Sequence, residues 1–172
     1  MRFLKFLGAM AAAALLHFLG SRLWPAFPQA ADLFLLVAAL EARHGNPTTG
    51  MFAGLACGWT TDALTGGPFG LFGVADTVVG YFTARAAQQL VVQRTSGLTA
   101  LFAAGAAAQQ AIIAGLAMLF RDEVELPEPF WLAVKVVATA LLGLAWTYAA
   151  AALARRFRRW RGSRATKLQM PS

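Results

Sequence analysis

The chain has 172 residues, of which 58% are hydrophobic and only 13% are charged, and its mean hydropathy is +0.56. A soluble domain of this size would carry roughly a quarter charged residues, so the composition argues against a soluble protein and indicates an integral membrane protein. A formal net charge of +7 would suggest a nucleic-acid partner in a soluble protein. Here the basic residues flank apolar stretches, where they set orientation in the bilayer, and we expect no nucleic-acid partner.

Six apolar stretches are candidates for membrane-spanning helices, which predicts an all-α bundle of about six spans. A span needs about 20 apolar residues, at 1.5 Å each, to cross a hydrocarbon core of about 30 Å. The stretches are Phe3–Leu23, Ala30–Ala42, Pro47–Leu64, Phe69–Leu90, Leu98–Phe120 and Phe130–Leu153. The second is short, so we expect it to be tilted, partial or continuous with its neighbours. The first is interpreted as a retained span, because its apolar run is too long for a signal peptide.

Basic residues divide unequally between the two predicted membrane faces. Of the 15, 12 fall on one side if there are six spans: Arg2, Lys5, Arg43, Arg85, Arg94 and the seven that follow Leu153. The other side receives Arg22 and Arg121 and the acidic loop at 122–128. This asymmetry predicts an even number of spans with both termini in the cytoplasm. We therefore divide the chain into a bundle over residues 1–154 and a basic cytoplasmic tail over 155–172, disordered beyond Arg161.

A glycine-rich helix is the most distinctive local pattern. Gly50, Gly54 and Gly58 recur every four residues and share one helix face, and Asp62 is the next step along it. Small residues let helices approach closely in lipid, where apolar burial gives no net drive. Together with Asp76, these residues are our candidate partner-binding site. Packing of the small-residue faces against one another within the monomer is the alternative.

Three ionisable residues in apolar surroundings need explanation. Asp62 either contributes to a polar site between two helices or caps the turn at 65–68, and the sequence favours neither. Asp76 lies farther into a span, where a structural hydrogen-bond partner is favoured over a ligand. Lys135 is placed about five residues into the last span. It either reaches the membrane interface, which is slightly favoured, or pairs with Asp62 or Asp76.

The remaining polar residues of the spans predict structural roles. Gln109 and Gln110 lie mid-span and point about 100° apart, so at least one must find a partner, by default across helices. Cys57 and His17 are each expected to be packing residues. No nucleophile–base pair, phosphate-binding loop or metal-ligand spacing is present in the sequence, so we expect no catalysis, no metal and no cofactor.

The order of these motifs resembles the rod shape-determining MreD family. The segment beginning at Asp32 follows a proline-containing break, and a short basic loop follows at 43–45. The helix then ends in Gly58-Trp-Thr-Thr-Asp62-Ala-Leu, the turn reads Thr65-Gly-Gly-Pro-Phe-Gly-Leu71, and the next helix ends Val79-Gly-Tyr-Phe. The match covers about Ala31–Arg85, and the rest of the chain agrees only in hydropathy.

The resemblance implies a non-enzymatic protein of the bacterial inner membrane that acts in cell elongation. Its partners would be a single-span MreC-like protein, a RodA-like glycosyltransferase and a class B penicillin-binding protein, in support of peptidoglycan synthesis and rod shape. The fold of that family is similar to the substrate-binding subunits of energy-coupling vitamin transporters. This similarity supplies the alternative function, a membrane subunit that binds a small, vitamin-like solute.

Overall fold

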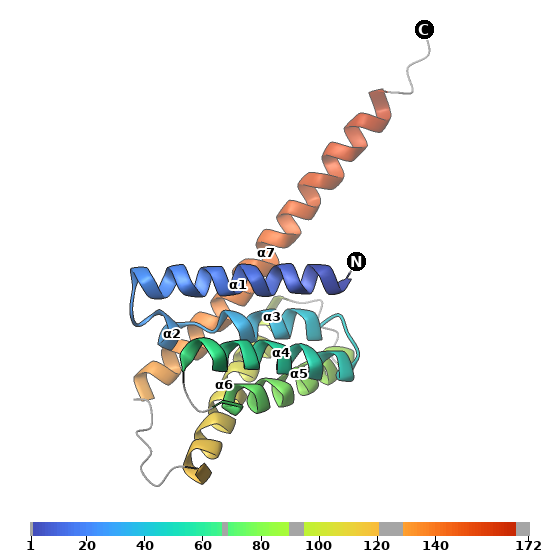
Figure 1. The fold of residues 1–172 in the computed structure, drawn as a ribbon. Coiled ribbons are helices and arrows are strands. Elements are labelled where there is room, and N and C mark those ends of the chain that lie inside the picture. Colours follow the sequence, from blue (N-terminus) through green and yellow to red (C-terminus); the bar gives the residue numbers. More distant parts are fainter. Residues whose placement is uncertain (1, 67–68, 90–94, 121–128, 168–172) are drawn as a thin grey trace.

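The computed structural model describes residues 2–66, 69–89, 95–120 and 129–167, which form helices and no strand (Figure 1). The helices are α1 (Arg2–Leu23), α2 (Phe27–Ala30), α3 (Leu33–Ala42), α4 (Pro47–Thr65), α5 (Leu71–Gln89), α6 (Thr95–Phe120) and α7 (Pro129–Lys167). The expectation of an all-helical bundle is confirmed.

Three of these helices are long and apolar enough to cross a membrane, over Phe3–Leu23, Thr99–Leu119 and Phe130–Ala149. The structure therefore supports a membrane protein with a helical bundle. The helices α4 and α5 each have 19 residues but are less apolar, because threonines, glycines and one aspartate interrupt each of them. The second predicted span, Ala30–Ala42, corresponds mainly to α3, which has only 10 residues and follows the short helix α2.

The break between α2 and α3 follows from local sequence. Pro28 lies in the first turn of α2, where its missing N–H costs nothing. Ala31 and Asp32 then adopt extended backbone conformations, and the Asp32 side chain caps α3 by accepting a hydrogen bond from the Leu35 amide. All three residues from Ala30 to Asp32 are buried, so this irregular backbone is enclosed by protein.

The helices run alternately back and forth through the bundle (Figure 1). The most extensive pairing is between α4 and α5, and α3 contacts α1, α4, α5, α6 and α7. Because α3 is at the centre, its side chains enter all three apolar clusters of the core. These clusters centre on Phe34 with Cys57, on Leu36 with Phe102, and on Leu35 with Val79. Cys57 is thus a packing residue, as expected.

The last helix continues to Lys167 and projects beyond the bundle (Figure 1). The prediction of disorder beyond Arg161 is therefore wrong in the part that the structure describes. Arginine and lysine are good helix formers, and an established helix adds residues at little cost.

Candidate functional site

A buried glutamine links two buried aspartates at the centre of the bundle. The amide nitrogen Nε2 of Gln109 donates hydrogen bonds to Asp32 Oδ2 at 2.8 Å and to Asp76 Oδ1 at 2.7 Å. Gln109 and Asp76 are fully buried, and Asp32 is 5% exposed. The three side chains come from α6, from the start of α3 and from α5, so this one amide connects three helices.

The backbone break before α3 positions Asp32. While Oδ1 caps α3, the Asp32 backbone amide donates to the hydroxyl oxygen Oγ1 of Thr139 at 3.2 Å. Thr139 is buried on α7. The extended residue thus contributes its amide to one helix and its carboxylate to two others, which fixes α7 against the start of α3.

Lys135 is the cation next to these carboxylates. Its Nζ lies 3.7 Å from Asp32 Oδ2 and 5.2 Å from the ring centroid of Phe72, and its side chain is 12% exposed. The ion pair is with Asp32, whereas the sequence slightly favoured a lysine that reaches the membrane interface and gave Asp62 or Asp76 as the alternative partners. The ring adds a favourable interaction with the ammonium group.

Asp76 has one carboxylate oxygen that makes no hydrogen bond in the described part of the chain. This atom, Oδ2, is buried. Asp32, Asp76, Gln109, Lys135 and Thr139 are called the polar centre from here on. Since it sets two carboxylates against one ammonium group, and buried charge is costly in a bilayer, the polar centre is our leading candidate for a functional site.

Asp62 is separate from the polar centre and organises the turn between α4 and α5. Its oxygens accept hydrogen bonds from the amides of Gly70, Phe72 and Gly73, each at 3.0 Å. These are free N–H groups at the start of α5, which a carboxylate satisfies well. Gly66, with a φ of 65°, ends α4 in the left-handed conformation that glycine adopts readily. Of the two roles considered for Asp62, a polar site between helices and a cap of the turn, this geometry matches the cap.

The glycine face of α4 is occupied by α5. A Cβ atom at Gly50, Gly54 or Gly58 would overlap the backbone carbonyl oxygen of Gly80, Asp76 or Phe72, respectively. The two helix backbones are therefore in direct contact along this face, and all three glycines are buried. A partner that touched these glycines would have to displace α5.

Gln110 extends the polar centre toward its edge. Its Nε2 donates to Gln109 Oε1 at 3.0 Å, and the residue is half-buried. The two glutamines therefore contact each other, and Gln109 alone reaches the aspartates.

Sequence reasoning did not identify Asp32 and Thr139 as site residues. Asp32 carried a signal, because an isolated acidic residue between a proline-containing break and an apolar helix is both a helix cap and a buried charge. Thr139 carried none, since threonine is common in membrane helices and its role depends on a backbone amide 107 residues away.

The polar centre does not line either of two cavities that lie among the described residues. The larger, about 460 Å³, lies between α1, α3 and α7, and the smaller, about 330 Å³, lies between α5 and α6. In the same part of the chain no group of three or more histidine, cysteine or acidic residues is arranged to hold a metal ion. The contacts within the polar centre are hydrogen bonds and one ion pair.

Comparisons of the chain with protein-family models, curated proteins and solved structures found no match. The resemblance to the MreD family thus remains a prediction that depends on the motifs of residues 31–85.

Proposed function

We propose that this protein is a non-enzymatic scaffold of the bacterial inner membrane that acts in the cell-elongation machinery, as the MreD resemblance implies. It binds an MreC-like single-span protein and works beside a RodA-like glycosyltransferase and a class B penicillin-binding protein. Its role is to support peptidoglycan synthesis and rod shape by holding these membrane proteins together.

One observation carries the proposal: the motifs that resemble the family have specific structural roles in this chain. Asp62 caps α5, the three glycines of α4 allow its contact with α5, and Asp32 caps α3 at the polar centre. The segment 31–85 is thus a closely packed unit whose polar groups serve the fold. Asp62 and Asp32 accept hydrogen bonds from the protein's own amides, which favours a scaffold over a solute-binding subunit.

The topology we propose has six passes, with α2 and α3 together making the second. The alternating course of the helices brings the loop at 43–46 and the N-terminus to one end of the bundle (Figure 1). The basic residues Arg2, Lys5 and Arg43 belong to this end, which we assign to the cytoplasm because cytoplasmic loops are rich in lysine and arginine.

The partner helix is expected on the outer face of α1. Of the three apolar helices long enough to span, α1 is the least enclosed by the rest of the protein. Exposed apolar residues follow one another on it at spacings of three and four: Leu4, Leu7, Ala11, Leu15 and Phe18. This outer stripe is about 21 Å long at 1.5 Å per residue, enough to contact a spanning helix over most of its length. Ala11 at its middle permits close approach.

The test is co-purification of the MreC-like protein in mild detergent. We expect Ala11→Trp, which places a bulky ring in the middle of the outer stripe, to abolish co-purification while the protein stays folded. The matched control is Ala111→Trp, at an exposed alanine of α6. If both variants still co-purify with the partner, the outer stripe is not the interface. If the wild-type protein does not retain the partner, the proposed function is wrong.

The alternative, a subunit that binds a small solute, is favoured by one feature, the unpartnered Oδ2 of Asp76. An oxygen of this kind would accept a hydrogen bond from a polar ligand if the bundle opened. A small molecule that co-purifies with the protein and is lost on Asp76→Ala would support this function and count against the scaffold.

A further inference from the structure

The cavity between α1, α3 and α7 is an elongated groove in the membrane-facing surface. One wall is α1, from Lys5 to Leu16, the other is α7, around Ala145 and Trp146, and α3 contributes residues from Leu33 to Glu41. Its lining is almost entirely apolar, and its volume is about 460 Å³. It exists because small side chains on the walls, such as Ala9 and Ala145, leave the space between the two helices unfilled.

The length of the groove determines which occupant fits. From Lys5 to Leu16 on α1 the helix rises about 16 Å, and from Leu33 to Glu41 on α3 it rises about 12 Å, at 1.5 Å per residue. This is about half of a 30 Å hydrocarbon core, the depth of a single leaflet. A spanning helix would extend well beyond a contact of this length, whereas one acyl chain requires only this depth.

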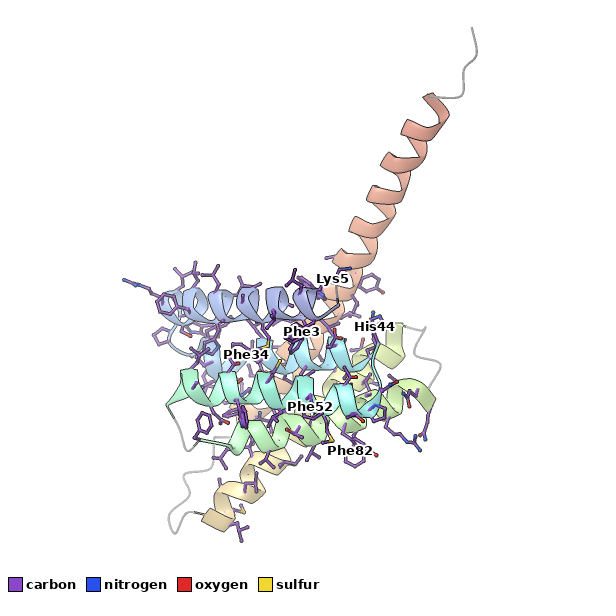
Figure 2. The ribbon with its side chains drawn as sticks, turned by 45° about the vertical axis from the view of Figure 1, so that its right-hand side comes forward. Phe3, Lys5, Phe34, His44, Phe52 and Phe82 are labelled. Atoms are coloured by element: carbon purple, nitrogen blue, oxygen red, sulfur yellow. The ribbon has the colours of Figure 1, made fainter. Side chains whose placement is uncertain are left out.

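Two charged residues of opposite sign, Lys5 on α1 and Glu41 on α3, line one end of the groove. Lys5 lies on the first turns of α1, is exposed, and is at the end where α7 leaves the bundle (Figure 2). This is the end that carries the basic loop at 43 and the N-terminus. A basic side chain where an apolar groove meets the interface complements a lipid phosphate, and such pockets between membrane helices bind lipid headgroups.

From this combination of shape and charge we infer that the groove is a binding site for one phospholipid of the cytoplasmic leaflet. One acyl chain lies between α1 and α7 against α3, and the phosphate contacts Lys5. The site is separate from the outer stripe of α1, because Lys5, Ala9 and Leu16 lie on a different side of that helix from Ala11 and Leu15. The acyl chain makes van der Waals contacts with both walls of the groove, in a space that the protein's own side chains leave empty.

The experiment counts phospholipids that stay bound to the full chain after extended washing in mild detergent, by native mass spectrometry and by phosphate analysis. We expect about one retained phospholipid per chain. Ala145→Phe fills the groove from the α7 wall and is expected to remove the lipid, whereas Ala111→Phe, at an exposed alanine outside both cavities, is expected to retain it.

A second pair of variants tests the headgroup contact. We expect Lys5→Gln to weaken retention about fivefold, equivalent to roughly 1 kcal/mol for one basic residue at the interface. Arg22→Gln, at the opposite end of the same helix, is expected to have no effect. Thermal unfolding of each variant, measured in the same detergent, identifies any that fails to fold, and each pair of variants tests the site independently of the other.

Equal lipid retention by Ala145→Phe and Ala111→Phe would overturn the proposal, and so would equal retention by Lys5→Gln and Arg22→Gln. If Ala145→Phe released a protein partner but left the bound lipid unchanged, the occupant would be a helix and the lipid site would be wrong. A scaffold that fails to bind its partner but retains the lipid would leave this inference intact, so the two proposals can fail separately.

Discussion

At the scale of single residues, the polar centre depends on how one cation and two carboxylates share a buried space. Lys135 is next to Asp32, and Gln109 donates to both aspartates. Leaving one member of a buried ion pair without its partner costs more free energy than the pair contributes when intact. Substitutions at this site therefore report whether the ion pair stabilises the folded bundle.

Lys135→Met is expected to lower the stability of the folded bundle by about 3–5 kcal/mol, because Asp32 would stay buried without its cation. Lys135→Arg keeps the positive charge and should lose less stability than Lys135→Met. The control is Arg22→Met, at an exposed basic residue. Thermal unfolding in detergent measures all three, and a Lys135→Met protein as stable as the control would contradict a stabilising pair.

Asp62→Ala is expected to lower stability by roughly 2–4 kcal/mol, because the amides of Gly70, Phe72 and Gly73 would lose their acceptor. Asp62→Asn keeps one side-chain oxygen, and its stability should lie between that of Asp62→Ala and that of the wild type. Hydrogen exchange at these amides should accelerate in Asp62→Ala. Unchanged exchange would show that the cap does not hold the turn.

At the scale of elements, the contact between α4 and α5 depends on the missing side chains of the glycines. A Cβ at Gly54 would meet the carbonyl oxygen of Asp76, which cannot rotate away as a flexible side chain can. Overpacking at such a point forces the two backbones apart. Because this carbonyl belongs to Asp76, a shift of the backbone here also disturbs the polar centre.

Gly54→Ala is expected to destabilise the bundle by about 1–3 kcal/mol or more, despite the better helix propensity of alanine. Gly115→Ala is the matched control, because a Cβ there meets nothing within 4 Å. That control should be neutral or stabilising by up to about 1 kcal/mol. If both variants unfold at the same temperature, the contact between α4 and α5 is less close than described.

At the scale of the whole molecule, the topology determines which surfaces face the cytoplasm. The segment from α2 to α3 decides between an even and an odd number of passes, since α3 alone is only about 15 Å long at 1.5 Å per residue. Arg22 and His44 are exposed and flank this segment. Both can be replaced by cysteine as accessible reporters, and the native Cys57 is buried and should not react.

We expect a membrane-impermeant thiol reagent to label Arg22→Cys in intact cells whose outer membrane has been permeabilised. His44→Cys should react only after lysis, because its loop carries Arg43 and belongs to the end that we assign to the cytoplasm. Labelling of both residues from the same side would mean that α2 and α3 do not cross the membrane together. The six-pass topology would then be wrong.

The apolar runs of the sequence determined that the chain forms membrane-type helices and where most of these helices begin and end. Helix formation is local: it depends on continuous apolar stretches and on breaks such as Pro28, Pro47 and Gly66. The glycine spacing of α4 likewise indicated a close helix contact, and an isolated acidic residue at the start of a helix, as at Asp32, is the pattern of a cap.

Only the tertiary structure decided which helix fills the glycine face and which polar residues meet. Gln109 joins residues that are 77 and 33 positions away in the chain, and Lys135 met an aspartate other than the two that the sequence suggested. From the sequence alone, several carboxylates are equally good partners for the same lysine or amide. The choice among them depends on how the helices cross and on their relative rotation, which side-chain packing throughout the bundle sets.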